Sequence, residues 1–172
     1  MNLEVLFSKK QIKEKVNKLA QEINDIYSSD TDLVVVCILK GAFIFYSDLL
    51  KQLNQNVLCD FCSLSFYGGN KEVSNPARLT LDIKTVIKDK DVLLVDCMSD
   101  KGYSFNFARQ ILEFRNPKSI KTACLVFKPL AVKNAKIDFK GFEVEQDCFV
   151  VGYGIDYKAQ YRQLDYFARV VE

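Results

Sequence analysis

Two aspartates, a glycine and a serine follow an apolar run in the middle of the chain, a combination suited to holding a phosphorylated sugar. Residues 92–95 have the composition of a buried parallel strand, and residues 104–112 have the periodicity of an amphipathic helix. Asp96 and Asp100 are therefore expected at the carboxyl end of the strand, where open α/β sheets bind ligands. The backbone amides that lead into the helix favour an anion such as phosphate.

The common nucleotide-binding loops do not occur in this segment. It matches neither G-x-x-x-x-G-K-[ST] nor G-x-G-x-x-G. Taken alone, the segment is also typical of an ordinary strand-to-helix turn in which both aspartates are surface caps. The choice between these two interpretations depends on the rest of the chain.

Strand and helix patterns alternate around this turn. Ser8 and Gln11 have the spacing of a capping box ahead of a helical pattern. Strands are predicted at residues 33–39, 57–65, 79–83, 92–95, 120–126, 149–152 and 167–171, and helices at 12–27, 42–53 and 104–112. The polar stretch at 67–78 is predicted to be a mobile loop. This order predicts one α/β domain, residues 1–172, with a mostly parallel twisted sheet flanked by helices.

Composition is that of an ordinary globular protein. The chain has 172 residues, of which 49% are hydrophobic and 27% charged, enough for a substantial core. A formal net charge of +2 with dispersed basic residues disfavours a nucleic-acid partner. No run approaches the ~20 apolar residues of a membrane span, and no signal-peptide pattern begins the chain. We therefore expect a cytoplasmic protein without a membrane partner.

The chain contains no histidine, which limits its chemistry. Ser-His-Asp and Cys-His catalysis are excluded, so any acid or base must be a carboxylate, lysine, tyrosine or cysteine. Cys59 and Cys62 form a C-x-x-C, but on a strand this odd spacing directs the two side chains to opposite faces. Without a second such pair, the cysteines do not predict a zinc site.

Separated segments along nearly the whole chain resemble the hypoxanthine(-guanine) phosphoribosyltransferase family, which has the type I phosphoribosyltransferase fold. They are LKG at 39–41, SFYGG at 65–69, the acidic turn at 96–104, KP at 128–129, and FVVGYGIDY at 149–157 followed by Arg162. The last segment is the most specific, because other phosphoribosyltransferases share only the acidic turn.

The resemblance implies a reaction. A 5-phosphoribosyl group would move from phosphoribosyl pyrophosphate to N9 of hypoxanthine or guanine in the presence of Mg²⁺, giving IMP or GMP and pyrophosphate. The resemblance also implies a small hood formed by the N- and C-terminal segments, and a homodimer or homotetramer.

The resemblance further implies the site residues. Asp100 would lie near purine N7 and accept or share a proton. The 5'-phosphate and ribose would contact Asp96, Cys97, Met98, Ser99, Lys101, Gly102, Tyr103 and Ser104. The purine would contact Lys128, Cys148, Phe149 and Val150, and the pyrophosphate would contact Lys40, Gly41 and Arg162. A donor at Lys128 would favour a 6-oxopurine over adenine.

The remaining expectations concern the metal, the lid and the backbone. Asp156 and Asp96 would belong to the magnesium shell, and Phe66 and Tyr67 to a lid that closes over the reaction. A non-proline cis peptide bond is expected between Leu39 and Lys40.

Four departures from the family pattern lie in or beside the predicted site. Cys97 replaces a carboxylate, Lys101 a small hydroxyl residue, Phe66 a serine and Phe127 an acid. The lost carboxylate removes a contact worth about 1.5–3 kcal/mol, so affinity or rate is expected to fall about 10- to 100-fold. We predict an active but weakened enzyme. The alternatives are a nucleotide-binding homologue with a sensing or interaction role and little catalysis, and an RNA-binding regulator.

Overall fold

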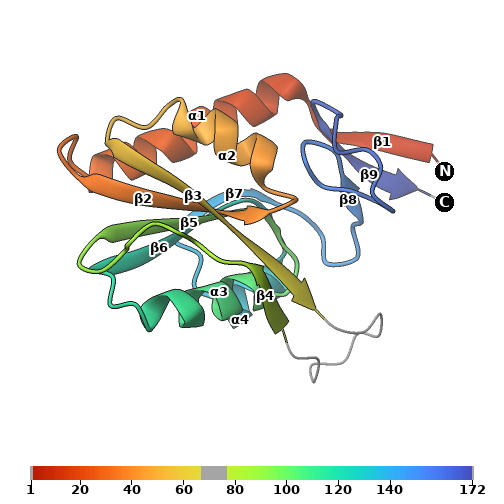
Figure 1. The fold of residues 1–172 in the computed structure, drawn as a ribbon. Helices are drawn as coiled ribbons and strands as arrows, with labels where there is room; N and C mark the ends of the chain where they lie inside the picture. The colour runs from red at the N-terminus through yellow and green to blue at the C-terminus, as the bar shows by residue number, and fades with distance from the viewer. Residues whose placement is uncertain (1, 67–76, 172) are drawn as a thin grey trace.

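Two β-sheets of unequal size organise the protein in a computed structural model that describes residues 2–66 and 77–171 (Figure 1). The elements are β1 (Asn2–Phe7), α1 (Lys9–Ile26), β2 (Asp32–Leu39), α2 (Phe43–Leu50), β3 (Asn56–Phe66), β4 (Ala77–Leu81), β5 (Asp91–Ser99), α3 (Tyr103–Glu113), β6 (Ser119–Phe127), α4 (Pro129–Asn134), β7 (Phe139–Glu143), β8 (Val150–Val151) and β9 (Phe167–Val171). The larger sheet has the strand order β4-β3-β2-β5-β6-β7, and the smaller has the order β1-β9-β8.

The larger sheet is mostly parallel. Strands β3, β2, β5, β6 and β7 pair in parallel, and β4 pairs antiparallel with β3 at the edge. Helices α1 and α2 cover one face, and α3 and α4 lie on the other (Figure 1). The predicted α/β class with a mostly parallel sheet flanked by helices is confirmed.

The smaller sheet brings the two ends of the chain together. Strand β9 pairs antiparallel with both β1 and β8, so N- and C-terminal segments form one unit beside the main sheet (Figure 1). We call this sheet and the loop of residues 152–166 the hood. Its presence matches the hood that the family resemblance implies.

The first helix begins where the sequence predicts. The Ser8 side chain accepts a hydrogen bond from the Gln11 amide, and the Gln11 side chain accepts one from the Ser8 amide. This capping box satisfies amides that have no partner within the helix. The apolar face of α1 is buried through Ile12, Val16, Leu19, Ala20 and Ile23.

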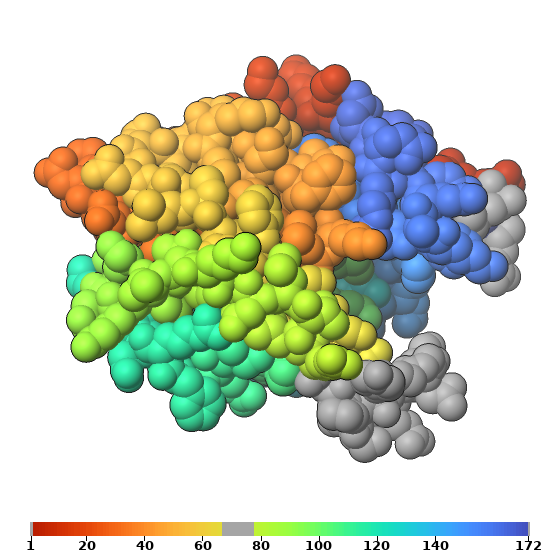
Figure 2. All heavy atoms as spheres, viewed as in Figure 1, coloured from red at the N-terminus to blue at the C-terminus, as the bar shows by residue number. Residues whose placement is uncertain are grey.

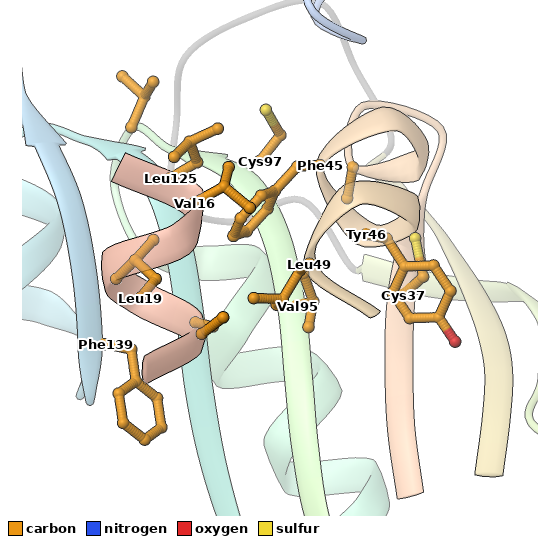
Figure 3. Packing of buried hydrophobic residues seen from close by; sticks show 14 of the residues in the cluster. Val16, Leu19, Cys37, Phe45, Tyr46, Leu49, Val95, Cys97, Leu125 and Phe139 are labelled. Atoms are coloured by element: carbon orange, nitrogen blue, oxygen red, sulfur yellow. The ribbon is translucent and has the colours of Figure 1, made fainter. Parts of the chain in front are cut away.

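The core consists of two layers, one on each face of the main sheet. Alternate residues of β5 face opposite layers: Val95 and Cys97 point toward α1 and α2, whereas Leu94 points toward α3 and α4. Figure 3 shows the first layer, in which Phe45 of α2 packs over the β5 side chains. Both faces of the central strands are buried, which is why these strands read as continuous apolar runs.

Several elements differ from the sequence-based expectation. β1, α4 and β7 were not predicted, because each is short and owes its stability to the sheet or core on which it packs. Strand β5 continues to Ser99, so Asp96 lies within the strand instead of after it. Pairing with Cys124 of β6 extends the ladder through this polar residue. The predicted mobile loop falls mostly in residues 67–76, outside the described residues.

Within residues 2–66 and 77–171, no helix combines the length and apolar composition needed to cross a bilayer.

Asp60 ties β3 to the loop that precedes β5. Its carboxylate accepts hydrogen bonds from the amides of Phe61 (2.8 Å), Lys84 (2.8 Å) and Thr85 (2.6 Å). Burial alone would raise the pKa of Asp60, but the bonds from Thr85, Phe61 and Lys84 lower the pKa below its ordinary value. The ionised carboxylate therefore stabilises the fold at neutral pH, and this stabilisation is lost as the pH falls through the depressed pKa.

Asp60→Asn is expected to lower the free energy of unfolding by about 1–3 kcal/mol at pH 7, because the amide group faces backbone donors. The difference from the wild type should begin to shrink below about pH 4, the ordinary pKa of an aspartate in the unfolded chain, and should vanish as the pH falls through the lower pKa of the folded carboxylate. Urea denaturation across this pH range measures both effects. Asp30→Asn, at an exposed aspartate, is the control. An equal loss at pH 3 and pH 7 would contradict the assignment.

Candidate active site

The acidic turn forms a small pocket between the end of β5 and the start of α3. The pocket has a volume of about 200 Å³ and is lined by Phe66, Met98, Ser99, Asp100, Lys101, Gly102, Tyr103 and Ser104. The amides at the start of α3 have no partner within the helix, and the helix dipole places partial positive charge there. The pocket is therefore suited to a phosphate-sized anion.

Gly102 is required for the shape of this turn. It caps α3 with a φ of +80°, in the left-handed region that favours glycine. A Cβ at this position would lie 2.6 Å from the Cβ of Ala135, which follows α4. The sequence predicts a backbone turn at this position, and the structure adds that α4 packs directly behind it.

Asp100 and Lys128 are brought together at the edge of the pocket. Parallel pairing places Ser99 of β5 beside Phe127 of β6, so the residues that follow each strand become neighbours. The Lys128 Nζ lies 2.7 Å from the Asp100 Oδ1. Lys128 is only 7% exposed, whereas the Asp100 side chain is 54% exposed. The buried ammonium is thus compensated by a carboxylate that faces solvent and remains open to a ligand.

Asp96 lies deeper, within β5. Burial raises the pKa of the Asp96 carboxyl to about 7, and hydrogen bonds from the Cys97 and Met98 amides oppose that rise. The group therefore exchanges between its neutral and ionised forms near neutral pH. A bound cation or hydroxyl donor would favour the ionised form.

Cys97 points away from the pocket and into the core. The residue is fully buried, and it packs with Val16, Phe45 and Leu125 in the layer of Figure 3. Its thiol donates a weak hydrogen bond to the carbonyl of Tyr153 in the hood, with an S···O distance of 3.6 Å. Burial raises the pKa of this thiol well above its ordinary value, so the thiol stays neutral. Its assigned contact with ribose stays a prediction.

Cys97→Asp would place a carboxylate in this closed position, opposite a carbonyl oxygen. We expect the free energy of unfolding to fall by about 2–4 kcal/mol, because a buried carboxyl without a donor is strongly disfavoured. Chemical denaturation measures the loss, and Cys59→Asp at an exposed cysteine of β3 is the control. Unchanged stability together with a higher turnover rate would show instead that the carboxylate reaches the ligand.

The hood loop carries a second charged pair. Arg162 lies 2.6 Å from the Asp156 carboxylate and also donates to the Gly154 carbonyl at 2.6 Å. The Ala159 amide donates to the other Asp156 oxygen at 2.8 Å. The loop is therefore closed on itself, and its aspartate and arginine are paired in the free protein.

The hood loop packs against the loop that precedes α2. A Cβ on Gly154, whose φ is +99°, would overlap the carbonyl oxygen of Gly41. The space-filling view shows the blue C-terminal segment lying against orange atoms at the start of α2 (Figure 2). The cis peptide bond predicted between Leu39 and Lys40 is present at this contact region.

Phe149 presents an exposed aromatic ring directly before β8. It is 49% exposed and packs edge-to-face with Tyr157, at a centroid distance of 5.3 Å. The neighbouring Val150 is buried, and Cys148 is half-buried. Burial raises the pKa of the Cys148 thiol, and the charges of Lys128 and Arg169 oppose that rise. Phe149 is therefore an exposed ring supported by Tyr157, while Lys128 and Asp100 form their pair at the ends of β6 and β5.

Comparison with known proteins supplies the family. A model of the phosphoribosyl transferase domain matches residues 3–158. The chain is also 37% identical to the hypoxanthine-guanine phosphoribosyltransferase of Dictyostelium discoideum, across 100% of this chain and 97% of the relative. This chain belongs to the phosphoribosyltransferase family. The hypoxanthine phosphoribosyltransferase of Escherichia coli K12 is 34% identical, across 98% of this chain and 96% of the relative.

Solved structures of phosphoribosyltransferases show the same fold. A hypoxanthine-guanine phosphoribosyltransferase of Bacillus anthracis aligns with a TM-score of 0.88 at 34% identity, covering 98% of each chain. A hypoxanthine phosphoribosyltransferase of Staphylococcus aureus aligns with a TM-score of 0.89 at 30% identity, covering 98% of this chain and 91% of the other.

The structure also places the other three departures from the phosphoribosyltransferase pattern. Phe127 is buried in the layer under α3 and α4, so an apolar side chain suits its surroundings. Lys101 and Phe66 both line the acidic-turn pocket. Tyr67, the other predicted lid residue, lies outside the described residues.

Two further residues of this phosphoribosyltransferase connect the hood loop with α2. Neither residue has a role assigned from the sequence: Asp48 lies in a predicted helix, and Tyr153 lies within the segment at 149–157 but is not singled out. In the structure the Tyr153 hydroxyl donates to the Asp48 carboxylate at 2.6 Å. Only the approach of the hood to α2 reveals this contact.

Proposed function

We propose that the protein transfers a 5-phosphoribosyl group from phosphoribosyl pyrophosphate to N9 of hypoxanthine or guanine, as the names of its relatives suggest. The observation that carries this proposal is the contact between Lys128 and Asp100 at the mouth of the acidic-turn pocket. In this arrangement Lys128 could donate to the exocyclic oxygen of a purine, and Asp100 could accept a proton from its ring. Both would lie next to a pocket that is large enough for a phosphate.

The phosphate end of the substrate would be held by backbone groups. Residues 101–104 line the pocket in which the 5'-phosphate would lie, and the amides at the start of α3 would donate to it. The Ser104 hydroxyl adds a donor, and the Lys101 ammonium adds positive charge. Met98, Ser99 and Tyr103 complete the wall of the pocket.

The purine would be recognised by its polar edge and its faces. Lys128 would donate to the 6-oxo group, and Asp100 would accept or share the proton at N7 as N9 forms its bond to the sugar. Phe149 would stack on the ring, and the backbone of Cys148 and Val150 would contact its other edge. Adenine presents an amino group that Lys128 cannot use as an acceptor, so 6-oxopurines are favoured.

The leaving pyrophosphate would lie between the two packed loops. Lys40 and Gly41 would approach it from one side and Arg162 from the other, with the guanidinium exchanging part of its contact with Asp156 for the phosphates. Asp96 would hold the ribose hydroxyls in its ionised form. The closed position of Cys97 leaves one side of the ribose without a charged partner, which supports a reduced activity.

The residues present fit a magnesium ion that is bound together with the substrate. Mg²⁺ usually keeps several waters and takes one or two carboxylates plus substrate phosphates. Asp156 and Asp96 are separate carboxylates of this kind, and in the part of the chain that the structure describes no three acidic, cysteine or histidine side chains converge. Bound Mg²⁺ would supply charge neutralisation to the departing pyrophosphate.

The proposal is tested with purified protein, Mg²⁺, phosphoribosyl pyrophosphate and each of hypoxanthine, guanine, xanthine and adenine. We expect IMP or GMP and pyrophosphate, detected by chromatography, with no product from adenine. Binding of IMP without turnover would favour the alternative of a sensing or interaction role. Binding of RNA that weakens steeply with salt would favour the regulator.

We also propose that the enzyme is a cytoplasmic homodimer or homotetramer. Exposed apolar side chains on α2 and β3, at Phe43, Leu58 and Phe61, support an interface there. Light scattering of the purified protein measures the number of subunits.

A further inference from the structure

Tyr153 has an unusual backbone conformation at the centre of the hood. Its φ is +45°, in a region that bulky side chains rarely adopt. The side chain is 6% exposed, and the next two residues lead directly to Asp156. A disfavoured conformation at a ligand-facing loop persists only where neighbouring contacts hold it.

Four contacts hold Tyr153. Its hydroxyl donates to the Asp48 Oδ2 at 2.6 Å, and its ring packs edge-to-face on Phe167 at a centroid distance of 5.5 Å. Its amide donates to the Leu164 carbonyl at 2.8 Å, and its carbonyl accepts the weak bond from Cys97. Two of the four reach outside the hood: the weak bond from Cys97 of β5, and the short bond to Asp48 of α2.

The carboxylate partner is held as well. Burial would raise the pKa of Asp48, but hydrogen bonds from Tyr153 and Lys51 lower the pKa below its ordinary value. The Lys51 ammonium lies 2.9 Å from the Asp48 Oδ1. Asp48 is therefore ionised at neutral pH and accepts a short, charge-assisted bond.

The bond joins the two loops that would enclose the pyrophosphate. Asp48 belongs to α2, which begins directly after the Lys40-Gly41 loop. Tyr153 precedes Gly154, whose carbonyl accepts from Arg162 and whose backbone packs against Gly41. A shift of α2 relative to the hood would therefore change the distance between the two phosphate-contacting loops.

We propose that Asp48 and Tyr153 are positioning residues that set the spacing between the Lys40-Gly41 loop and the Arg162 loop for pyrophosphate. This inference rests on the proposed function, because that function assigns both loops to one ligand. Neither residue touches the ligand, so the pair acts on affinity for the pyrophosphate group and not on the purine.

Tyr153→Phe tests the pair, because it removes the hydroxyl and keeps the packed ring. Isothermal titration with inorganic pyrophosphate and Mg²⁺ should show a Kd raised about fivefold, equivalent to about 1 kcal/mol. The KM for phosphoribosyl pyrophosphate should rise by a similar factor, whereas the KM for the purine should change less than about twofold.

Tyr46→Phe is the matched control. Tyr46 lies on α2, the helix that carries Asp48, and is 4% exposed. Its hydroxyl donates to the Val35 carbonyl in the main sheet at 2.9 Å. Removing that hydroxyl should lower the melting temperature much as Tyr153→Phe does, and it should leave the Kd for pyrophosphate within about twofold of the wild type.

Two changes at Asp48 complete the test. Asp48→Ala removes the acceptor of the Tyr153 hydroxyl and should weaken pyrophosphate binding. Asp48→Asn keeps an acceptor, so its Kd for pyrophosphate should be closer to that of the wild type. The double variant with Tyr153→Phe and Asp48→Ala should bind no more weakly than either single variant, because both remove the same bond.

Equal losses of pyrophosphate affinity in Tyr153→Phe and Tyr46→Phe, or no loss in either, would overturn the inference, as would a wild-type protein that does not bind pyrophosphate. A wild-type protein that binds pyrophosphate but forms no nucleotide, with Tyr153→Phe selectively weakened, would support the positioning pair while contradicting the proposed transfer reaction.

Discussion

Asp100→Asn should lower kcat for hypoxanthine about 100-fold, the scale of losing one acid or base in the transition state. The asparagine cannot take the purine proton, but its side-chain oxygen still accepts from Lys128, which lies 2.7 Å from the carboxylate in the wild type. The fold and the proposed purine site should therefore be kept. Single-turnover kinetics with phosphoribosyl pyrophosphate and hypoxanthine measure the rate.

The affinity for IMP distinguishes a role of Asp100 in proton transfer from a role in positioning the ligand. The Kd for IMP should change less than about threefold, since the nucleotide product has already lost the proton that Asp100 handles. Asp147→Asn, at an exposed aspartate of the loop before the hood, is the matched control and should leave the rate unchanged. A parallel fall in rate and IMP affinity would show that Asp100 only positions the ligand.

Lys128→Met should reduce kcat/KM for hypoxanthine and guanine about 10- to 100-fold, the effect of losing one charge-assisted hydrogen bond of about 1.5–3 kcal/mol. Methionine fills a similar volume, and the Asp100 side chain left behind is 54% exposed and can be solvated. The protein should therefore remain folded. Steady-state kinetics on each base give the loss for each substrate.

Discrimination between bases is the sharper measurement for Lys128. The value of kcat/KM should fall for the 6-oxopurines and not for adenine, so the ratio of kcat/KM for hypoxanthine to that for adenine should decrease. Lys133→Met, at an exposed lysine of α4, is the control and should leave all rates unchanged. Equal losses for hypoxanthine and for binding of pyrophosphate alone would place Lys128 outside the purine site.

These predictions together distinguish a weakened enzyme from a binding protein. In the proposed reaction, Asp100, Lys128, Phe149, Asp156 and Arg162 would provide the groups required. The neutral thiol of Cys97 faces the Tyr153 carbonyl instead of the pocket, so the proposed ribose site would lack the charge of a second carboxylate. The reduced activity that we propose would therefore originate at the sugar, as a loss of affinity or of rate.

Local sequence was sufficient to predict the elements that begin and end through short-range contacts. The capping box at Ser8 and Gln11 and the glycine turn into α3 are formed by residues a few positions apart. Apolar alternation over short windows likewise identified the central strands, because burial on both faces leaves a continuous apolar run. The order of these elements gave the α/β class.

Contacts between distant parts of the chain were decided only by the tertiary structure. The Tyr153 hydroxyl and the Asp48 carboxylate are 105 residues apart, and the Cys97 thiol is 56 residues from the carbonyl that it contacts. No local pattern specifies such pairs, since they depend on how the hood docks on α2 and β5. The sequence determined which groups are available and which elements carry them. The docking of hood, helix and sheet determined which groups meet, because side chains from separate elements become neighbours only when their backbones pack.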